Sequence, residues 1–154
     1  GGGGGGREAR RTMIAVDPPG VIAALRSLLE PDPRLVSAWL FGSVATGLAG
    51  PRSDVDIAYL ALDATSSESL RRERLELTGR ISIALEREVQ LVEIERVDAS
   101  LRMQVWRDGL LIFERDPERT HRLVERTLME WFDWEYARRQ HEAVLDRRFG
   151  VKRG

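Results

Sequence analysis

The sequence of 154 residues contains no cysteine, only two histidines and a single lysine, Lys152. Without cysteine the chain can form neither disulfide bonds nor thiolate metal sites, and it is compatible with a reducing compartment. Without a lysine in the body of the chain it has no Walker lysine, Schiff-base lysine or kinase-type lysine. Several classes of nucleotide-handling enzyme are therefore excluded.

Long hydrophobic runs and a strong net charge are also missing. No apolar stretch approaches the ~20 residues that span a bilayer, and none resembles a signal peptide, so we expect a cytoplasmic protein without a membrane partner. The formal net charge of −1 makes nucleic acid an unlikely partner. His121 and His141 lack the spacing of metal ligands on a helix, and we expect both on the surface.

The composition, 42% hydrophobic and 32% charged, is that of a globular protein in which strands and helices alternate. We expect a flexible Gly/Arg-rich tail at 1–12, a core at 13–116 and a C-terminal helix at 117–154. Strands are predicted at 35–41, 54–62, 89–94 and 110–113, and helices at 18–30, 65–86, 98–107 and 117–149. Asp17, Asp98 and the capping box Thr65-Ser66-Ser67-Glu68 are expected to begin three of these helices. The pattern predicts an α/β (α+β) fold with one small sheet of about four strands.

Two aspartates stand at the start of the second predicted strand. Asp54 and Asp56 are separated by one residue, so both carboxylates are expected on the same face. Aspartate is disfavoured in strands, and two carboxylates so close repel each other, which indicates a cation between them. Oxygen ligands favour Mg²⁺ over zinc.

The turn Gly42-Ser43 follows the first predicted strand directly and leads into a short helical turn closed by Gly47 or Gly50. Such a turn directs unpaired backbone N–H groups at one point, which suits a phosphate. Gly42 allows close approach of the backbone, and the Ser43 hydroxyl can donate to a phosphate oxygen.

The whole string LFGSVATGLAGPRSDVDIAYL joins these features: an apolar strand, Gly-Ser, ten residues, Asp-x-Asp and a second apolar strand. It resembles the signature of the DNA polymerase β-like nucleotidyltransferase superfamily, particularly its minimal nucleotidyltransferase (MNT) branch. The resemblance covers roughly residues 21–116 and implies a mixed sheet flanked by helices, with a long C-terminal helix.

By motif position, the resemblance implies that Gly42 and Ser43 hold the β- and γ-phosphates of a nucleoside triphosphate. It implies that Asp54 and Asp56 share two Mg²⁺ ions with it. Arg52, next to this strand, is a candidate phosphate contact, although an arginine in a Pro-Arg-Ser turn is usually just exposed. A plainer interpretation makes Gly42-Ser43 an ordinary turn and Asp54 a turn residue, but Asp56 has no local turn to serve.

The sequence departs from the family at one position. Active relatives carry a third carboxylate on a later strand, where this chain has Gln90 in the segment 89–92. A glutamine offers a metal only a carbonyl oxygen and cannot accept a proton from an attacking hydroxyl. Glu88 has the same strand parity as Gln90 but stands at the strand entry, and Glu93 has the opposite parity. Catalysis is therefore a separate question from binding.

The resemblance implies that the protein transfers a nucleoside monophosphate from Mg²⁺-NTP, with ATP favoured, to an acceptor hydroxyl. That acceptor would be a tyrosine of a HEPN-type ribonuclease toxin, which would make the chain an antitoxin. The alternatives are a weakened antitoxin that acts by protein binding alone, and a small-molecule transferase of the aminoglycoside type. Aromatic residues at 131–136 exceed what a narrow core-facing stripe needs, and they indicate either internal packing or a homodimer or partner interface.

Overall fold

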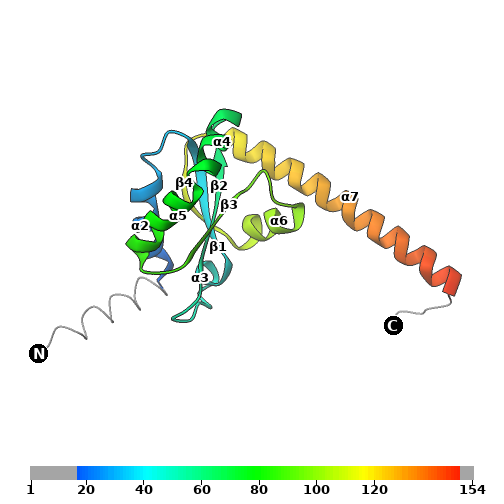
Figure 1. Ribbon diagram of the computed structural model, residues 1–154. Coiled ribbons are helices and arrows are strands. Elements are labelled where there is room, and N and C mark those ends of the chain that lie inside the picture. Colours follow the sequence, from blue (N-terminus) through cyan, green and yellow to red (C-terminus); the bar gives the residue numbers. More distant parts are fainter. Residues whose placement is uncertain (1–16, 150–154) are drawn as a thin grey trace, which may run out of the picture.

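The computed structural model describes residues 17–149 and shows one four-stranded sheet with helices on both faces (Figure 1). The predicted tail at 1–12 lies outside the described residues. In chain order the elements are α2 (Pro18–Leu29), β1 (Leu35–Phe41), α3 (Gly42–Thr46), β2 (Val55–Ala61), α4 (Ala64–Arg72), α5 (Arg74–Leu85), β3 (Val89–Glu93), α6 (Ala99–Asp108), β4 (Leu110–Glu114) and α7 (Pro117–Phe149).

The strand order in the sheet is β3-β2-β1-β4. Strand β1 pairs antiparallel with both β2 and β4, whereas β2 and β3 are parallel and are connected through α4 and α5. A parallel pair needs such a long crossover, which an antiparallel pair does not. The predicted mixed sheet with flanking helices and a long C-terminal helix is therefore confirmed.

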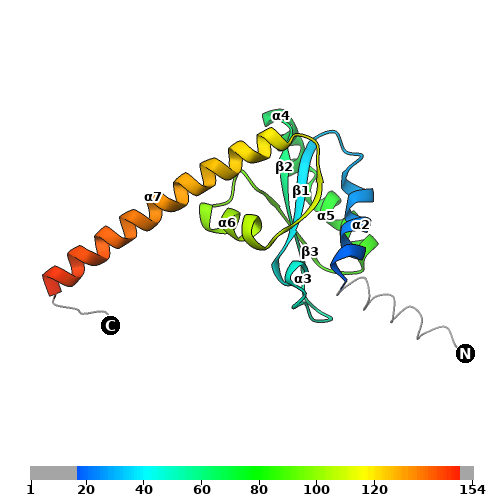
Figure 2. The same cartoon turned by 180° about the vertical axis from the view of Figure 1, so that it is seen from behind.

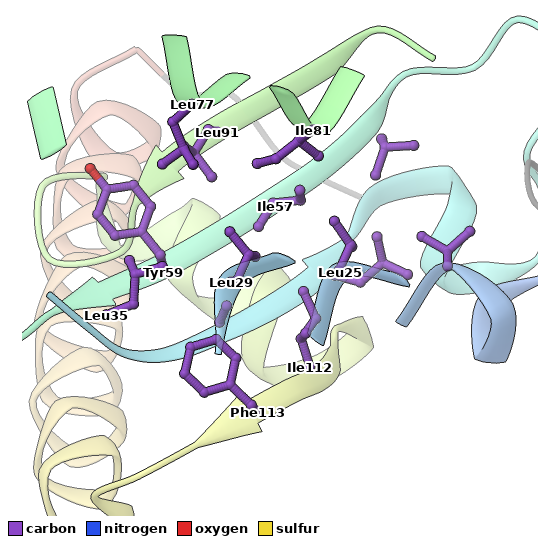
Figure 3. Close-up of a cluster of buried hydrophobic side chains, with 14 of the residues drawn as sticks. Leu25, Leu29, Leu35, Ile57, Tyr59, Leu77, Ile81, Leu91, Ile112 and Phe113 are labelled. Atoms are coloured by element: carbon purple, nitrogen blue, oxygen red, sulfur yellow. The ribbon is translucent and has the colours of Figure 1, made fainter. Parts of the chain in front are cut away.

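Apolar side chains fill both faces of the sheet. On one face Leu25 and Leu29 of α2 meet Leu77 and Ile81 of α5 over the strand residue Ile57 (Figure 3). On the other face a second cluster is formed by strand residues together with α6 and the start of α7, including Trp39, Phe41, Ala58, Val105 and Leu123. A sheet covered on both faces gives near-continuous burial, which explains why β1 is buried along its whole length.

The prediction of a single helix at 65–86 is wrong in two respects. It consists of two helices, because Glu73 leaves the helical conformation and its carboxylate accepts a bond of 2.6 Å from Arg34. The first of them begins earlier than expected: the Asp63 carboxylate accepts from the Ser66 amide at 2.7 Å, so Asp63 caps α4 and the predicted capping box does not. Asp17 precedes α2 as expected but makes no side-chain capping bond.

The two predicted helix starts farther along the chain are confirmed. The Asp98 carboxylate accepts from the Leu101 amide at 2.9 Å and caps α6. Asp116 stands before Pro117 and accepts from the Arg119 amide at 3.2 Å. From there α7 runs for 33 residues, packs on α6 near its beginning and then projects away from the sheet (Figures 1 and 2). None of the described helices combines the length and the apolar character needed to cross a membrane.

Candidate functional site

The turn between β1 and α3 brings Gly42 against the second strand. Gly42 has a φ of 75°, a left-handed conformation that side chains disfavour. A Cβ at Gly42 would also lie 2.2 Å from Oδ2 of Asp56. Glycine is thus required at this position for two independent reasons. Gly42 and Asp56 are far apart in the sequence motif, and the fold brings the turn directly against the carboxylate.

Ser43 is half-buried at the start of the five-residue helix α3. This helix ends at Gly47, which has a φ of 76°, as the sequence pattern predicted. The first amides of any helix lack partners within it, so those of α3 are available to an anion at the edge of the sheet where Gly42 meets Asp56.

The sheet register places Asp56 and Gln90 side by side. Asp56 is opposite Phe41 of β1 on one side and Gln90 of β3 on the other. Residues in register on neighbouring strands point to the same face, so all three side chains lie on the face that α6 covers. Gln90 therefore faces the same side of the sheet as Asp56, as expected of the position of the missing carboxylate.

Asp54 lies one residue before β2 rather than within it, which corrects the predicted strand start. Its side chain is exposed, whereas that of Asp56 is half-buried. Burial raises the pKa of the Asp56 carboxyl, and the negative charge of Asp54 raises it further. The two carboxylates are thus close enough to repel each other, and a cation between them would relieve that repulsion.

The donor set fits a hard, oxygen-ligated cation such as Mg²⁺. It consists of the two carboxylates and the amide oxygen of Gln90, all of which are oxygen ligands. Across residues 17–149, no three or more histidine, aspartate and glutamate side chains are grouped closely enough to hold a metal ion.

Of the two glutamates near Gln90, Glu93 does not face the side of the sheet on which Asp56 lies. Glu93 is in register with Tyr59, on the opposite face of the sheet, and its Oε1 accepts a bond of 2.6 Å from the Ser67 hydroxyl. Glu88 precedes β3 and has an exposed side chain, while its carbonyl accepts from the Val55 amide at 2.9 Å. The parity argument against Glu93 is confirmed.

The segment between α3 and β2 contains Arg52, which is exposed on a turn. Its predicted contact with phosphate is not tested by the fold. A second arginine, which the sequence did not single out, holds this turn from beneath: Arg87 is buried and donates to the carbonyl oxygens of Gly50, at 2.8 Å, and Ser53. An arginine just before a strand carries no sequence signal for such a contact.

Helix α7 carries the remaining predicted features. His121 and His141 are both exposed, as expected, and Nε2 of His121 lies 3.0 Å from the Glu125 carboxylate. The aromatic side chains farther along are not absorbed by the core: Phe132 and Tyr136 are about two-thirds exposed. Of the two interpretations left open, internal packing therefore does not account for Phe132 and Tyr136.

Comparison with known proteins gives one family over most of this core. Residues 24–118 match the family described as "Polymerase beta, Nucleotidyltransferase". The protein adenylyltransferase MntA of Shewanella oneidensis is 33% identical over 85 residues, which are 55% of this chain and 58% of that relative. The aligned part thus spans less than two thirds of the length of the relative.

Solved structures share the fold beyond that core. A toxin–antitoxin structure with AMP-PNP has a TM-score of 0.60 and 26% identity, and covers 81% of this chain and 95% of the other. Residues 1–116 are a smaller part of the chain than the 81% that is covered, so the likeness extends into α7. A tri-AMPylated Shewanella oneidensis HEPN toxin in complex with MNT antitoxin has a TM-score of 0.52 and 24% identity, covering 87% and 97%.

Proposed function

Because this chain belongs to the polymerase β nucleotidyltransferase family, we propose that it binds a magnesium nucleoside triphosphate, ATP in the first place, and transfers its nucleoside monophosphate to an acceptor hydroxyl. The observation that carries this proposal is the contact between the Gly42 turn and the Asp56 carboxylate, with Asp54 beside it. A turn with free amides and a pair of repelling carboxylates are brought together at one sheet edge, which suits a polyphosphate and its cation.

Each residue of the proposed site binds a different part of the magnesium nucleotide. Gly42 leaves room for a phosphate because it has no side chain, and the Ser43 hydroxyl donates to a phosphate oxygen. Asp54 and Asp56 would hold Mg²⁺, which when bound neutralises the charge of the triphosphate and polarises its phosphorus. Arg52 contributes positive charge from the exposed turn. We assign nucleotide binding to residues 13–116.

Gln90 limits the chemistry that these residues can perform. It faces the same side of the sheet as Asp56 but supplies no negative charge and no base. The acceptor hydroxyl must therefore lose its proton without help from this position. We propose a transferase that binds nucleotide well and turns it over slowly.

The acceptor we propose is a tyrosine of a HEPN-type toxin, so that the chain acts as an antitoxin in the cytoplasm. Two observations on relatives support this: the relative MntA is named a protein adenylyltransferase, and a HEPN toxin is AMPylated in complex with an MNT antitoxin of the same fold. A small-molecule acceptor has no support from these relatives.

Residues 117–154 are assigned to partner binding. Beyond its contact with α6, helix α7 presents a stripe of exposed apolar side chains at helical spacing, namely Met129, Phe132 and Tyr136. Aromatic residues and methionine are enriched in protein interfaces, and a large exposed apolar patch is unusual for a monomer. We propose that the toxin covers this stripe, and a second copy of the chain is the alternative occupant.

The presence of Gln90 in place of a carboxylate favours a second candidate function. If Gln90 removes transfer entirely, the chain neutralises its proposed toxin by contact alone through α7. Both functions predict a complex, but only the first predicts a modified partner.

The test first establishes whether a HEPN reading frame adjoins that of this chain and then co-expresses the two proteins. With Mg²⁺ and ATP, a toxin tyrosine should gain one adenylyl group by mass spectrometry, and the matched Asp56→Asn protein should leave it unmodified. A toxin that is inhibited by wild-type protein without any gain in mass would reject transfer and leave the binding function.

A further inference from the structure

Arg87, which lies outside the motif, is hydrogen-bonded to the turn that precedes Asp54. Arg87 is 8% exposed, and its guanidinium donates through Nη2 to the Gly50 carbonyl, at 2.8 Å, and through Nη1 to the Ser53 carbonyl. The same two residues also bond each other: the Ser53 amide donates to the Gly50 carbonyl at 3.2 Å, and the Gly50 amide donates to the Ser53 hydroxyl at 2.9 Å.

The backbone of Arg87 is itself fixed at the end of α5. Its amide donates to the Ser82 carbonyl at 3.2 Å, and the Ser82 hydroxyl donates to the Arg87 carbonyl at 2.5 Å. The next residue, Glu88, accepts from the Val55 amide and begins the pairing of β2 with β3. Arg87 thus joins the end of a helix and the start of a strand to the turn at 50–53.

Asp54 needs this support more than Asp56 does. Asp56 is held within β2 by its neighbours on β1 and β3, whereas Asp54 stands before the strand. None of residues 46–54 is buried, and Leu48 is 82% exposed. With so little apolar contact, the position of this segment depends on its hydrogen bonds, and the two from Arg87 reach it from a rigid part of the fold.

We propose that Arg87 is a positioning residue of the nucleotide site, which holds the Gly50–Ser53 turn and thereby sets the place of Asp54 as a ligand of the magnesium nucleotide. This rests on the proposed function for the identity of the ligand. Arginine suits the role because its planar guanidinium can donate to two carbonyls at once, which a lysine ammonium does with less geometric definition.

The competing explanation is that Arg87 only stabilises the fold. Arg102 offers a matched control, because it is equally buried, 4% exposed, and its guanidinium bonds Glu130 on the boundary between α6 and α7. Loss of either arginine should lower the melting temperature. Only loss of Arg87 should change the turn and the response to Mg²⁺.

The first measurement is hydrogen exchange on nucleotide-free full-length protein. In Arg87→Gln, peptides that contain Gly50 and Ser53 should exchange at least about tenfold faster than in wild type, while Arg102→Gln should leave them unchanged. Ser53→Ala, which removes the acceptor of the Gly50 amide, is a milder variant that should loosen the same peptides. If the turn in Arg87→Gln and Ser53→Ala exchanges as in wild type, the proposal is wrong.

The second measurement is a titration of Mg²⁺ at fixed ATP, followed by the thermal shift. Loss of a residue that orients a metal ligand typically lowers metal affinity about 10–100-fold. Arg87→Gln should therefore need about tenfold or more Mg²⁺ for half of the shift, Arg87→Lys should fall between it and wild type, and Arg102→Gln should match wild type within about twofold.

The two proposals fail in different ways. A wild-type protein without any shift would reject nucleotide binding, and the exchange measurement would still decide whether Arg87 orders the turn. A normal wild-type shift with the same Mg²⁺ requirement in Arg87→Gln and Arg102→Gln would reject the positioning role alone.

Discussion

At the scale of single residues, Gly42 differs from a glycine that is needed only for its left-handed backbone conformation. Gly47 has nearly the same φ, 76° against 75°, but a Cβ there would meet nothing within 4 Å. Gly47→Ala should therefore lower stability only by the backbone strain, roughly 1–2 kcal/mol. Gly42→Ala should lower it further, because its Cβ would collide with Asp56, and it should also weaken nucleotide binding. Equal melting temperatures for the two variants would contradict the contact.

Asp56 gives a prediction that depends on pH. Burial and the charge of Asp54 raise its pKa, so the ionised carboxylate is less favourable in the folded chain than in the unfolded one. The resulting loss of stability is absent below the ordinary value of 3.8 and grows as pH rises through the raised pKa.

Asp56→Asn should therefore raise the melting temperature of the nucleotide-free protein at pH 7, by roughly 1–4 °C for a chain of this size, and should have little effect near pH 3. Glu68→Gln, on an exposed carboxylate, is the control and should change neither. Thermal melts across this pH range measure the effect. A variant that is less stable than wild type at pH 7 would show that Asp56 supports the fold rather than opposing it.

Gln90 separates an enzyme from a binding protein. Its register with Asp56 places it on the same face of the sheet, at the position where the resemblance implies a third carboxylate. Gln90→Asp should therefore increase the rate of nucleotide transfer with little change in nucleotide affinity, because it restores transition-state stabilisation and not ground-state binding. Single-turnover rates and calorimetric affinities would measure the two effects. A fast wild-type enzyme that Gln90→Asp leaves unchanged would point to Glu88 or to a partner residue as the missing group.

At the scale of elements, the sequence predicted the strands and helix starts that are determined by runs of apolar residues and by capping residues or prolines. All four strands and the start of α7 follow from runs such as 35–41 and from Asp116-Pro117. The family motif was enough to single out Asp54 and Asp56 at the start of the second strand, because the two residues are close in sequence. Parity alone was enough to reject Glu93.

What the sequence could not predict depends on contacts between distant residues. The break at Glu73 coincides with its bond to Arg34, 39 positions away. The support of the Gly50–Ser53 turn comes from Arg87, more than 30 positions later. In both cases an arginine binds across the fold, and a charged residue in a polar stretch gives no sign of which partner it will find.

Helix α7 supplies the prediction at this scale. Phe132→Asp and Tyr136→Asp should release the proposed HEPN partner from a co-purified complex, because they place charge in the proposed interface. Both side chains are exposed, so the isolated protein should melt within about 2 °C of wild type. Leu75→Asp is the matched control: Leu75 is 90% exposed on α5, away from α7, and its substitution should leave the complex intact. Loss of the complex in all three variants, or in none, would contradict the assignment.

At the scale of the whole molecule, the proposed nucleotide site lies on the face of the sheet that α6 and the start of α7 cover. Asp56 and Gln90 are in register with Phe41, which belongs to the apolar cluster under α6 and the start of α7. Helix α7 packs on α6, which covers this face, and then projects away from the sheet (Figures 1 and 2). This arrangement suits a macromolecular acceptor, since the partner can be recognised at a distance from the atoms that react.

The central claim is that Asp54 and Asp56 hold a magnesium nucleotide against the Gly42 turn. Its most direct test is the change in melting temperature of wild-type and Asp56→Asn protein on adding ATP with Mg²⁺ and ATP with EDTA. A ligand that binds only the folded state stabilises it by about 2.7 kcal/mol at about a hundredfold excess over Kd. We predict a shift that requires Mg²⁺ in wild type and is largely lost in Asp56→Asn. Equal shifts in the two proteins would contradict the assignment of the site.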